Sequence, residues 1–218
     1  MERIPPRVEL EKMLERLKPH PDPNPWLEQY TTPAKVAAEM LFTAAYIHDD
    51  IEGKLIADLG CGTGRLGIGA LLLGARSIVG VDIDQKAVQV AMENAKGEGV
   101  LERCQWVVGD IAPLRGVFDT VLMNPPFGTR RRHLDVRFLS EALRLAGSVY
   151  SLHKSSTRRF ITGFVRRQGG RVSALLQVDL DIPRMFDFHE KARRPVAVDL
   201  YRITRRDQRV YKKEKPHP

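Results

Sequence analysis

Cysteine is scarce in this chain of 218 residues, which contains only Cys61 and Cys104. Neither the cysteines nor the histidines stand at the spacing of a metal-ligand motif, so the sequence predicts that the chain itself binds no metal. Two cysteines also exclude a disulfide framework, and Cys61 lies inside a glycine-rich turn. We therefore expect reduced thiols and a cytoplasmic protein.

Long hydrophobic runs are missing as well. No stretch comes close to eighteen uninterrupted apolar residues, so no membrane span is expected. The segment from Met1 to Pro6 also lacks the apolar stretch of a signal peptide. Hydrophobic residues nevertheless make up 43% of the chain, which is enough for the full core of one domain.

Acidic residues are the minority among the charges. The chain has 27 Asp and Glu against 35 Lys and Arg, so its net charge is +8 and its isoelectric point is about 9.7. A basic balance favours a nucleic acid or another polyanion as partner. Because basic surfaces without such a partner are also common, the positions of the basic residues have to decide between these two interpretations.

The N-terminal region combines a helix with a proline-rich linker. A short charged helix is expected over residues 1–18, and the prolines from Pro19 to Pro25 then require an extended chain. Thr32 is expected to be the N-cap of a helix over residues 33–47, with Pro33 at its first position.

The remainder of the chain alternates between apolar strands and helices. The predicted strands are 54–59, 77–83, 104–109, 118–123, 148–152, 171–180 and 196–203, and the predicted helices are 65–73, 85–96, 135–146 and 156–168. This alternation predicts an α/β, Rossmann-like fold: a seven-stranded, mostly parallel sheet with helices on both faces. No helix separates the last two strands, so the last strand is expected to be antiparallel. The predicted organisation is an N-terminal helix and linker (1–25), a main domain (26–204) and a basic tail (205–218).

A glycine-rich turn, Asp58-Leu59-Gly60-Cys61-Gly62-Thr63-Gly64, connects the first of these strands to the helix at Arg65. Its glycines allow positive φ angles and a close approach of a ligand, and the helix start adds amide donors and a positive dipole end. Asp82 ends the next strand, where a carboxylate can accept both ribose hydroxyls of an adenosine. Asp110 ends the third strand, where it can bind the adenine amine.

The same turn contains Gly62-Thr63-Gly64-Arg65-Leu66-Gly67, which matches the G-x-G-x-x-G dinucleotide fingerprint. An NAD-dependent dehydrogenase is therefore an alternative, and so are glycines that only shape a tight turn. Asp58 would repel a pyrophosphate but would attract the ammonium and sulfonium groups of S-adenosylmethionine. The series of Asp58, Asp82 and Asp110 with the glycines favours that cofactor.

A second motif, Asn124-Pro125-Pro126-Phe127, follows the fourth strand, at the sheet edge where ligands bind in open α/β folds. The prolines fix two consecutive φ angles, so the Asn124 side-chain oxygen and the Pro125 carbonyl can point at one ligand. Two acceptors can hold the hydrogens of an exocyclic amine while its lone pair faces a sulfonium methyl group. Phe127 can stack on a base held out of the RNA stack. In isolation the motif would be an ordinary turn, and its position after the cofactor-binding half favours catalysis.

These motifs resemble those of class I S-adenosylmethionine-dependent methyltransferases. More closely, the chain resembles the methyltransferase-like protein five family, the small-subunit ribosomal RNA adenine-N6 methyltransferases. The segments that carry this similarity are Leu27-Glu28-Gln29-Tyr30-x-Thr32, Asp58-Leu59-Gly60-Cys61-Gly62, Asp82-Ile83-Asp84, Asn124-Pro125-Pro126-Phe127-Gly128-Thr129 and Tyr150-Ser151-Leu152-His153-Lys154-Ser155-Ser156-Thr157. The charge and prolines favour an archaeal member.

The resemblance implies the class I methyltransferase fold, with S-adenosylmethionine as cofactor and S-adenosylhomocysteine as product. It implies catalysis by Asn124, Pro125, Pro126 and Phe127. It also implies a cofactor pocket lined by Gln29, Thr32, Gly60, Thr63, Arg65, Asp82, Asp110 and Ile111, to which the motifs add Tyr30, Asp58, Gly62, Gly64, Ile83 and Asn124. Thr63 and Arg65 differ from the animal members, so their contacts are expected from the backbone.

The same resemblance implies a protein partner. Members of the family pair with a small zinc-containing activator of the Trm112 type, and the chain is therefore expected to form such a heterodimer. The activator is expected to pair with a sheet edge and to cover apolar surface.

Basic residues gather near the proposed base pocket. Arg130-Arg131-Arg132-His133 follows the catalytic motif and is the expected phosphate clamp, with a solvated loop as the alternative. His153, Lys154 and Arg158 follow the fifth strand at the same edge and are further candidates for RNA binding, although such a histidine is more often structural. If these basic residues neutralise several RNA phosphates, the affinity for RNA should fall steeply as the salt concentration rises.

The sequence therefore predicts methylation of adenine N6 in small-subunit ribosomal RNA. Guanine-N2 methylation of RNA is an alternative with the same chemistry. Protein-glutamine methylation is disfavoured by the basic charge and by Phe127 in place of a tyrosine. A non-catalytic RNA-binding scaffold is disfavoured by Asn124 and by the complete cofactor series.

Overall fold

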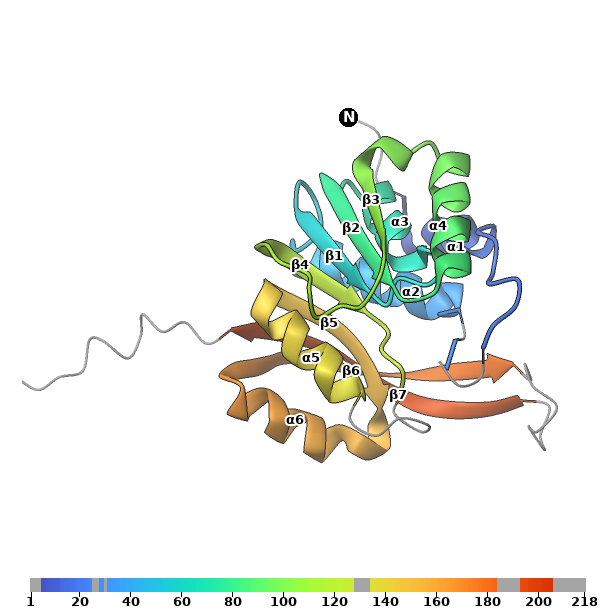
Figure 1. The fold of residues 1–218 in the computed structure, drawn as a ribbon. Helices are drawn as coiled ribbons and strands as arrows, with labels where there is room; N and C mark the ends of the chain where they lie inside the picture. The colour runs from blue at the N-terminus through green and yellow to red at the C-terminus, as the bar shows by residue number, and fades with distance from the viewer. Residues whose placement is uncertain (1–4, 25–27, 30, 128–133, 184–192, 206–218) are drawn as a thin grey trace, which may run out of the picture.

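A single seven-stranded sheet organises the chain, with the strand order β3-β2-β1-β4-β5-β7-β6 (Figure 1). The structure is a computed structural model, and it describes residues 5–24, 28–29, 31–127, 134–183 and 193–205. The strands are β1 (Leu55–Leu59), β2 (Ser77–Asp82), β3 (Cys104–Val108), β4 (Phe118–Met123), β5 (Ala146–Lys154), β6 (Gly170–Pro183) and β7 (Arg193–Arg205).

The predicted α/β class and sheet direction are confirmed. The β1–β2, β2–β3, β1–β4 and β4–β5 pairs are parallel, whereas β7 is antiparallel to both of its neighbours. The last two strands are longer than predicted because they form one long hairpin that continues beyond the body of the sheet (Figure 1).

Two helical layers cover the sheet. One layer contains α1 (Arg7–Glu15), α2 (Ala34–Phe42), α3 (Arg65–Leu72) and α4 (Gln85–Gly97), and the other contains α5 (Leu134–Leu145) and α6 (Arg158–Arg167) (Figure 1). A π-helix (Thr43–Ile47) continues α2, and short 3-10 helices cover Leu101–Arg103 and Ser155–Thr157. Among the described residues, no helix has the length and apolar character needed to cross a bilayer.

The N-terminal helix belongs to the main core. Leu10 and Leu14 of α1 are completely buried in the cluster that contains the residues of α2 and α3. Close packing requires Gly69 on α3, because a Cβ atom there would lie 2.4 Å from Leu41 Cδ1 and 3.1 Å from Leu14 Cδ2. Helix α1 is therefore part of the fold that positions the site.

Substitution of Leu14 tests this packing. We expect Leu14→Ala to lower the free energy of unfolding by about 2–4 kcal/mol, because the truncation leaves a cavity among buried side chains. Val8 lies exposed on the same helix, so Val8→Ala should change the free energy of unfolding by less than about 0.5 kcal/mol. Urea denaturation measures both, and equal stability of the two variants would contradict the assignment of α1 to the core.

Candidate active site

The glycine-rich turn lies at the carboxyl end of β1, held against β2. The Gly60 and Cys61 backbone N–H groups both donate to the Val81 carbonyl oxygen, at 2.8 and 3.1 Å. Gly64 has φ +83°, and a Cβ atom there would lie 2.7 Å from Trp106 Cη2, so the turn requires glycine at this position. The chain then enters α3 at Arg65.

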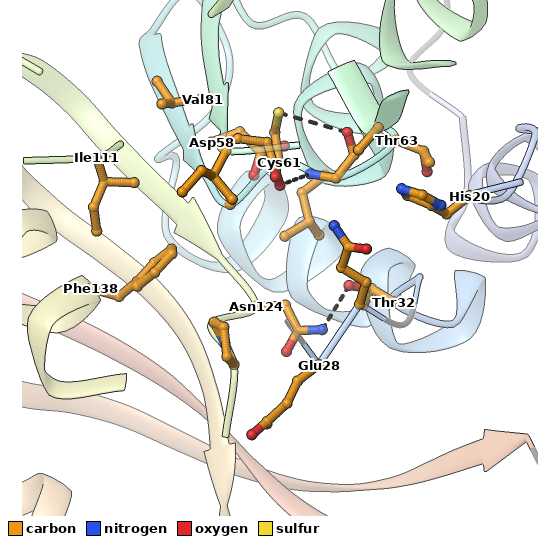
Figure 2. Close-up of a pocket in the computed structure, with 18 of the residues that line it drawn as sticks. His20, Glu28, Thr32, Asp58, Cys61, Thr63, Val81, Ile111, Asn124 and Phe138 are labelled. Carbon is orange, nitrogen blue, oxygen red and sulfur yellow. Dashed lines mark hydrogen bonds between the residues drawn. The ribbon is translucent and has the colours of Figure 1, made fainter. Parts of the chain in front are cut away.

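A pocket opens above this turn at the carboxyl ends of β1, β2 and β4 (Figure 2). It brings together these predicted cofactor residues: Gln29, Thr32, Asp58, Gly60, Gly62, Thr63, Arg65, Asp82, Ile83, Asp110, Ile111 and Asn124. Pro126 of the second motif also lines the pocket, whereas Gly64, Pro125 and Phe127 are not among its lining residues. Tyr30 lies outside the described residues.

Four buried side-chain atoms of this pocket have no hydrogen-bond partner within the described chain. Asp58 Oδ1 and Asn124 Oδ1 are acceptors, and Thr63 Oγ1 and Arg65 Nε can donate. Asp58 Oδ1 fits an ammonium group, and Thr63 Oγ1 and Arg65 Nε fit a carboxylate, the two charged groups at the amino-acid end of S-adenosylmethionine. The side chains of Thr63 and Arg65 are thus available to a ligand, in contrast to the expectation of contacts from the backbone alone.

Asp58 is a buried carboxyl group with a strongly shifted titration. Its Oδ2 accepts a hydrogen bond from the Gly67 backbone N–H at 2.8 Å, which ties β1 to α3. Burial raises the pKa of Asp58 to about 7, and the charge of Asp82 acts in the same direction. Near neutral pH the pocket therefore contains a carboxyl group that a cationic ligand would ionise.

A pH series of cofactor affinity tests this role of Asp58. An ammonium group binds the ionised carboxylate, so S-adenosylmethionine should bind about eightfold more weakly at pH 6 than at pH 7.5. The pKa of Asp82 is raised as well, mainly by burial, so Asp82 could also contribute to the pH dependence of affinity. Asp58→Asn distinguishes the two carboxyl groups, because it should flatten the pH dependence if Asp58 causes it. Calorimetry in buffers of different ionisation enthalpy should detect proton release by the wild type near pH 7. An unchanged pH dependence in Asp58→Asn would contradict the assignment.

Asp82 and Asp84 organise the second side of the pocket. Asp82 Oδ2 accepts from the Gly62 N–H at 2.8 Å and Oδ1 accepts from the Asp84 N–H at 2.9 Å. Asp84 Oδ1 caps α4 by accepting from the Lys86 N–H at 2.7 Å. The Asp82 carboxylate is thus fixed by the glycine turn and still borders the pocket.

The N-terminal segment lies across this side of the site. Asp84 Oδ2 accepts from Gln29 Nε2 at 2.7 Å and lies 3.2 Å from His20 Nε2. Further along the segment, Arg65 Nη1 donates to the Thr32 carbonyl at 2.7 Å. Gln29 therefore uses its amide to hold the segment in place as well as lining the pocket.

Sequence reasoning missed several lining residues, among them His20, Glu28, Arg137 and Phe138. Ile111 and Phe138 lie on one side of the pocket and His20 and Thr63 on the other (Figure 2). Phe138 comes so close to the turn that a Cβ atom on Gly60 would lie 2.9 Å from its ring. No local motif marks His20, Arg137 and Phe138, because each reaches the site from a part of the chain outside the recognised motifs. Glu28 lies inside the Leu27-Glu28-Gln29-Tyr30 segment but was not assigned to the pocket.

Asp110 has a partner that the sequence did not reveal. Its Oδ1 accepts from the Ala112 N–H at 2.8 Å and from Arg137 Nη2 at 2.6 Å. The Ala112 N–H, together with Arg137, holds the pKa of Asp110 below its usual value. Asp110 is therefore ionised and oriented before any ligand binds.

Asn124 follows β4 and faces the pocket. Its Nδ2 donates to Thr32 Oγ1 at 2.9 Å (Figure 2). Its Oδ1 is buried and has no hydrogen-bond partner in the described ranges of the chain. The predicted N-cap role of Thr32 is wrong: Pro33 is the N-cap of α2, and no side chain caps this helix. The Thr32 hydroxyl instead accepts a hydrogen bond from the Asn124 side-chain amide.

The RNA-binding prediction for His153 is wrong. Its side chain is buried, its Nε2 lies 2.8 Å from Ser151 Oγ, and its ring meets that of Tyr201 edge-on at 5.5 Å. Burial lowers the pKa of His153 to about 4, so the ring is neutral at pH 7. It supports β5 from inside the protein and cannot contact RNA.

The other basic candidates have different surroundings. Arg158 Nε and Nη2 each donate to the buried Asp199 carboxylate at 2.7 Å, so this arginine neutralises an internal acid. Lys154 Nζ lies 5.6 Å from the centre of the Phe127 ring, next to the proposed catalytic motif. Arg130, Arg131, Arg132 and His133 lie outside the described residues.

Comparison with known proteins assigns the family. Residues 31–125 match the family model of ribosomal protein L11 methyltransferase (PrmA). The chain is 42% identical over 201 residues to the rRNA N(6)-adenosine-methyltransferase Mettl5 of Drosophila melanogaster, covering 89% of this chain and 94% of that protein. It is 39% identical over 202 residues to METTL5 of Danio rerio, covering 90% and 97%.

A solved structure shows the same fold throughout. The protein PH1948 of Pyrococcus horikoshii, described as a candidate RNA methyltransferase, is 40% identical and superimposes with a TM-score of 0.85 over 93% of this chain and 97% of its own. The chain belongs to the METTL5 family of rRNA N(6)-adenosine-methyltransferases.

Proposed function

We propose that this protein transfers a methyl group from S-adenosylmethionine to the exocyclic N6 amine of an adenine in small-subunit ribosomal RNA. One observation carries the proposal: Asn124 Oδ1 is a buried acceptor without a hydrogen-bond partner among the described residues, in the same pocket as the unpaired atoms that fit an amino-acid zwitterion. The pocket thus combines a place for the donor with an acceptor for the substrate's amine hydrogens.

We assign roles in cofactor binding to residues that line the pocket. Asp58 would hold the ammonium of S-adenosylmethionine, and Thr63 and Arg65 would hold its carboxylate. Asp82 would accept the ribose hydroxyls and Asp110 the adenine amine. The apolar side chains of Ile83 and Ile111 would contact the faces of the adenine ring, while Gln29, Thr32 and the glycines at 60 and 62 complete the walls.

The proposed chemistry needs positioning rather than a strong base. When bound, S-adenosylmethionine supplies an electrophilic methyl group on a sulfonium and becomes S-adenosylhomocysteine. Asn124 Oδ1 and the Pro125 carbonyl would each accept a hydrogen bond from the N6 amine. These hydrogen bonds would favour a pyramidal nitrogen whose lone pair attacks the methyl carbon. The alkylated nitrogen is acidic and releases its proton readily. Phe127 would stack on the target base.

RNA would approach from the side of Phe127. Lys154, whose Nζ lies 5.6 Å from the centre of this ring, would contact a phosphate beside the target base. The segment Arg130-Arg131-Arg132-His133 follows the catalytic motif directly in sequence and is proposed as the phosphate clamp. A ribosomal substrate also fits a cytoplasmic protein.

We further propose that a small zinc-containing activator of the Trm112 type binds at β3, which is an edge strand of the sheet. The chain between β3 and β4 forms no helix, and three exposed valines lie along this edge among charged and polar residues: Val107 is 42%, Val108 50% and Val117 87% exposed. A partner strand paired with β3 would satisfy its free backbone groups and cover these valines.

Two matched edge variants test the activator site. Val107→Asp should weaken the heterodimer at least about tenfold, because it buries a charge in the interface. Leu176→Asp changes an exposed apolar residue of β6, at the opposite edge, and should leave the affinity unchanged. Titration of the purified partners measures both, and a heterodimer weakened only by Leu176→Asp would contradict the placement at β3.

The proposed activity is tested by transfer of a labelled methyl group. The protein, with and without the activator, is incubated with tritiated S-adenosylmethionine and with ribosomal RNA from a strain that lacks the gene. Label should enter small-subunit RNA and neither ribosomal proteins nor release factors. Label in protein would favour glutamine methylation, and binding of RNA without label would favour the scaffold.

A further inference from the structure

We propose that Thr32 is a positioning residue for methyl transfer, because its hydroxyl sets the orientation of the Asn124 side-chain amide. The inference rests on the proposed function, in which Asn124 Oδ1 accepts the hydrogens of the target amine. It assigns the N-terminal segment a part in catalysis, in addition to its place in the wall of the cofactor pocket.

The orientation of the Asn124 amide decides whether the site can bind an amine. The Thr32 hydroxyl oxygen lies 2.9 Å from Asn124 Nδ2, so the amide nitrogen is turned toward Thr32, and Oδ1 faces the pocket with no partner from the described residues. Rotation of the amide by half a turn would place its N–H groups opposite the N–H groups of the substrate. Two donors cannot bond to each other, so that orientation is inactive.

Thr32 itself is firmly held. Its side chain is buried, and its carbonyl accepts a hydrogen bond from Arg65 Nη1 at 2.7 Å. The next residue, Pro33, has φ −55° and starts α2, where its carbonyl accepts from the Ala37 N–H at 3.0 Å. The backbone is therefore fixed at the Thr32 carbonyl and at the start of α2 that follows it, and the hydroxyl contacts Asn124 from this support.

The proton of the Thr32 hydroxyl has no acceptor in the part of the chain that the structure describes, and Thr32 lines the pocket. A hydroxyl can donate as well as accept, so by itself it would tolerate either amide orientation. When an acceptor in the pocket takes this proton, the hydroxyl can only accept from Asn124. The contact thus becomes most selective when the pocket is occupied.

A double-mutant cycle separates this role from a merely structural one. Thr32→Val keeps the size of the side chain and removes the hydroxyl, whereas Thr32→Ser keeps the hydroxyl. At saturating cofactor and RNA, Thr32→Val should lower kcat about tenfold, and Thr32→Ser should keep at least about one third of it. Each variant is repeated in the Asn124→Asp background, where two equivalent carboxylate oxygens make orientation unnecessary. There Thr32→Val should lower the rate less than about threefold.

The free protein gives an independent readout. The side-chain NH₂ signals of Asn124, identified by their loss in Asn124→Asp, should shift in a ¹⁵N–¹H correlation spectrum of Thr32→Val and stay in place in Thr32→Ser. The melting temperature of each variant shows whether the variant is folded, and its cofactor dissociation constant shows whether it is saturated with cofactor in the assay.

Two results would overturn the role of Thr32. One is a Thr32→Val variant whose kcat lies within about threefold of the wild type, and the other is an equal loss in both backgrounds. Failure of the proposed function looks different, because the wild type would then transfer no methyl group to RNA at all.

Discussion

Asn124→Ala is expected to lower the rate of methyl transfer at least about 1,000-fold, while the dissociation constant of S-adenosylmethionine changes less than about threefold. The substitution removes the buried acceptor Oδ1, which has no partner in the described chain and is therefore reserved for a ligand. Positioned acceptors in a water-poor site act mainly on the transition state, so the loss falls on kcat.

The design of this experiment includes a chemical control. Asn124→Asp keeps an oxygen acceptor at the same place and should retain measurable transfer where Asn124→Ala retains none. Single-turnover rates with labelled cofactor measure the chemistry, and calorimetry measures cofactor binding. An equal loss of binding and rate in Asn124→Ala would show that Asn124 serves the cofactor rather than the amine.

Asp82→Ala should have the opposite profile and raise the dissociation constant of S-adenosylmethionine at least about 100-fold. The carboxylate is the proposed acceptor of the two ribose hydroxyls, and each hydrogen bond to a charged group contributes about 1.5–3 kcal/mol. The substitution also removes the acceptor of the Gly62 and Asp84 N–H groups. The glycine turn is therefore expected to loosen, which adds to the loss of affinity.

Asp22→Ala is the matched control for Asp82. Asp22 is an exposed acid that pairs with Lys86 at the start of α4, outside the pocket lining. Its removal should leave the affinity within about twofold, since exposed ion pairs contribute little. Comparable losses in both variants would indicate that the general negative charge of this region matters, and not the position of the Asp82 carboxylate.

The fold and the centre of the site could be predicted from the sequence because their signals are local. Apolar strands ending in Asp58, Asp82 and Asn124 indicate both the parallel sheet and the edge at which these side chains meet. The glycines of the turn indicate a strand-to-helix connection that a ligand can approach. Each of these features is contained in a few consecutive residues.

The contacts that refine the site depend on long-range packing and have no such signal. Thr32 looks like a helix cap by its position before Pro33, yet its hydroxyl bonds to Asn124, 92 residues further along the chain. His153 looks like a surface residue after a strand, yet β5 continues through it, β7 pairs beside it, and its ring packs against Tyr201. Arg158 looks available for RNA, yet it pairs with Asp199, 41 residues away.

Nucleoside mass spectrometry of small-subunit ribosomal RNA, after incubation with trideuteromethyl-labelled S-adenosylmethionine, tests the central claim most directly. Wild-type protein should produce deuterated N6-methyladenosine at a single position, and Asn124→Ala should produce none. Label in N2-methylguanosine, or equal amounts of labelled adenosine from the wild type and Asn124→Ala, would contradict the account.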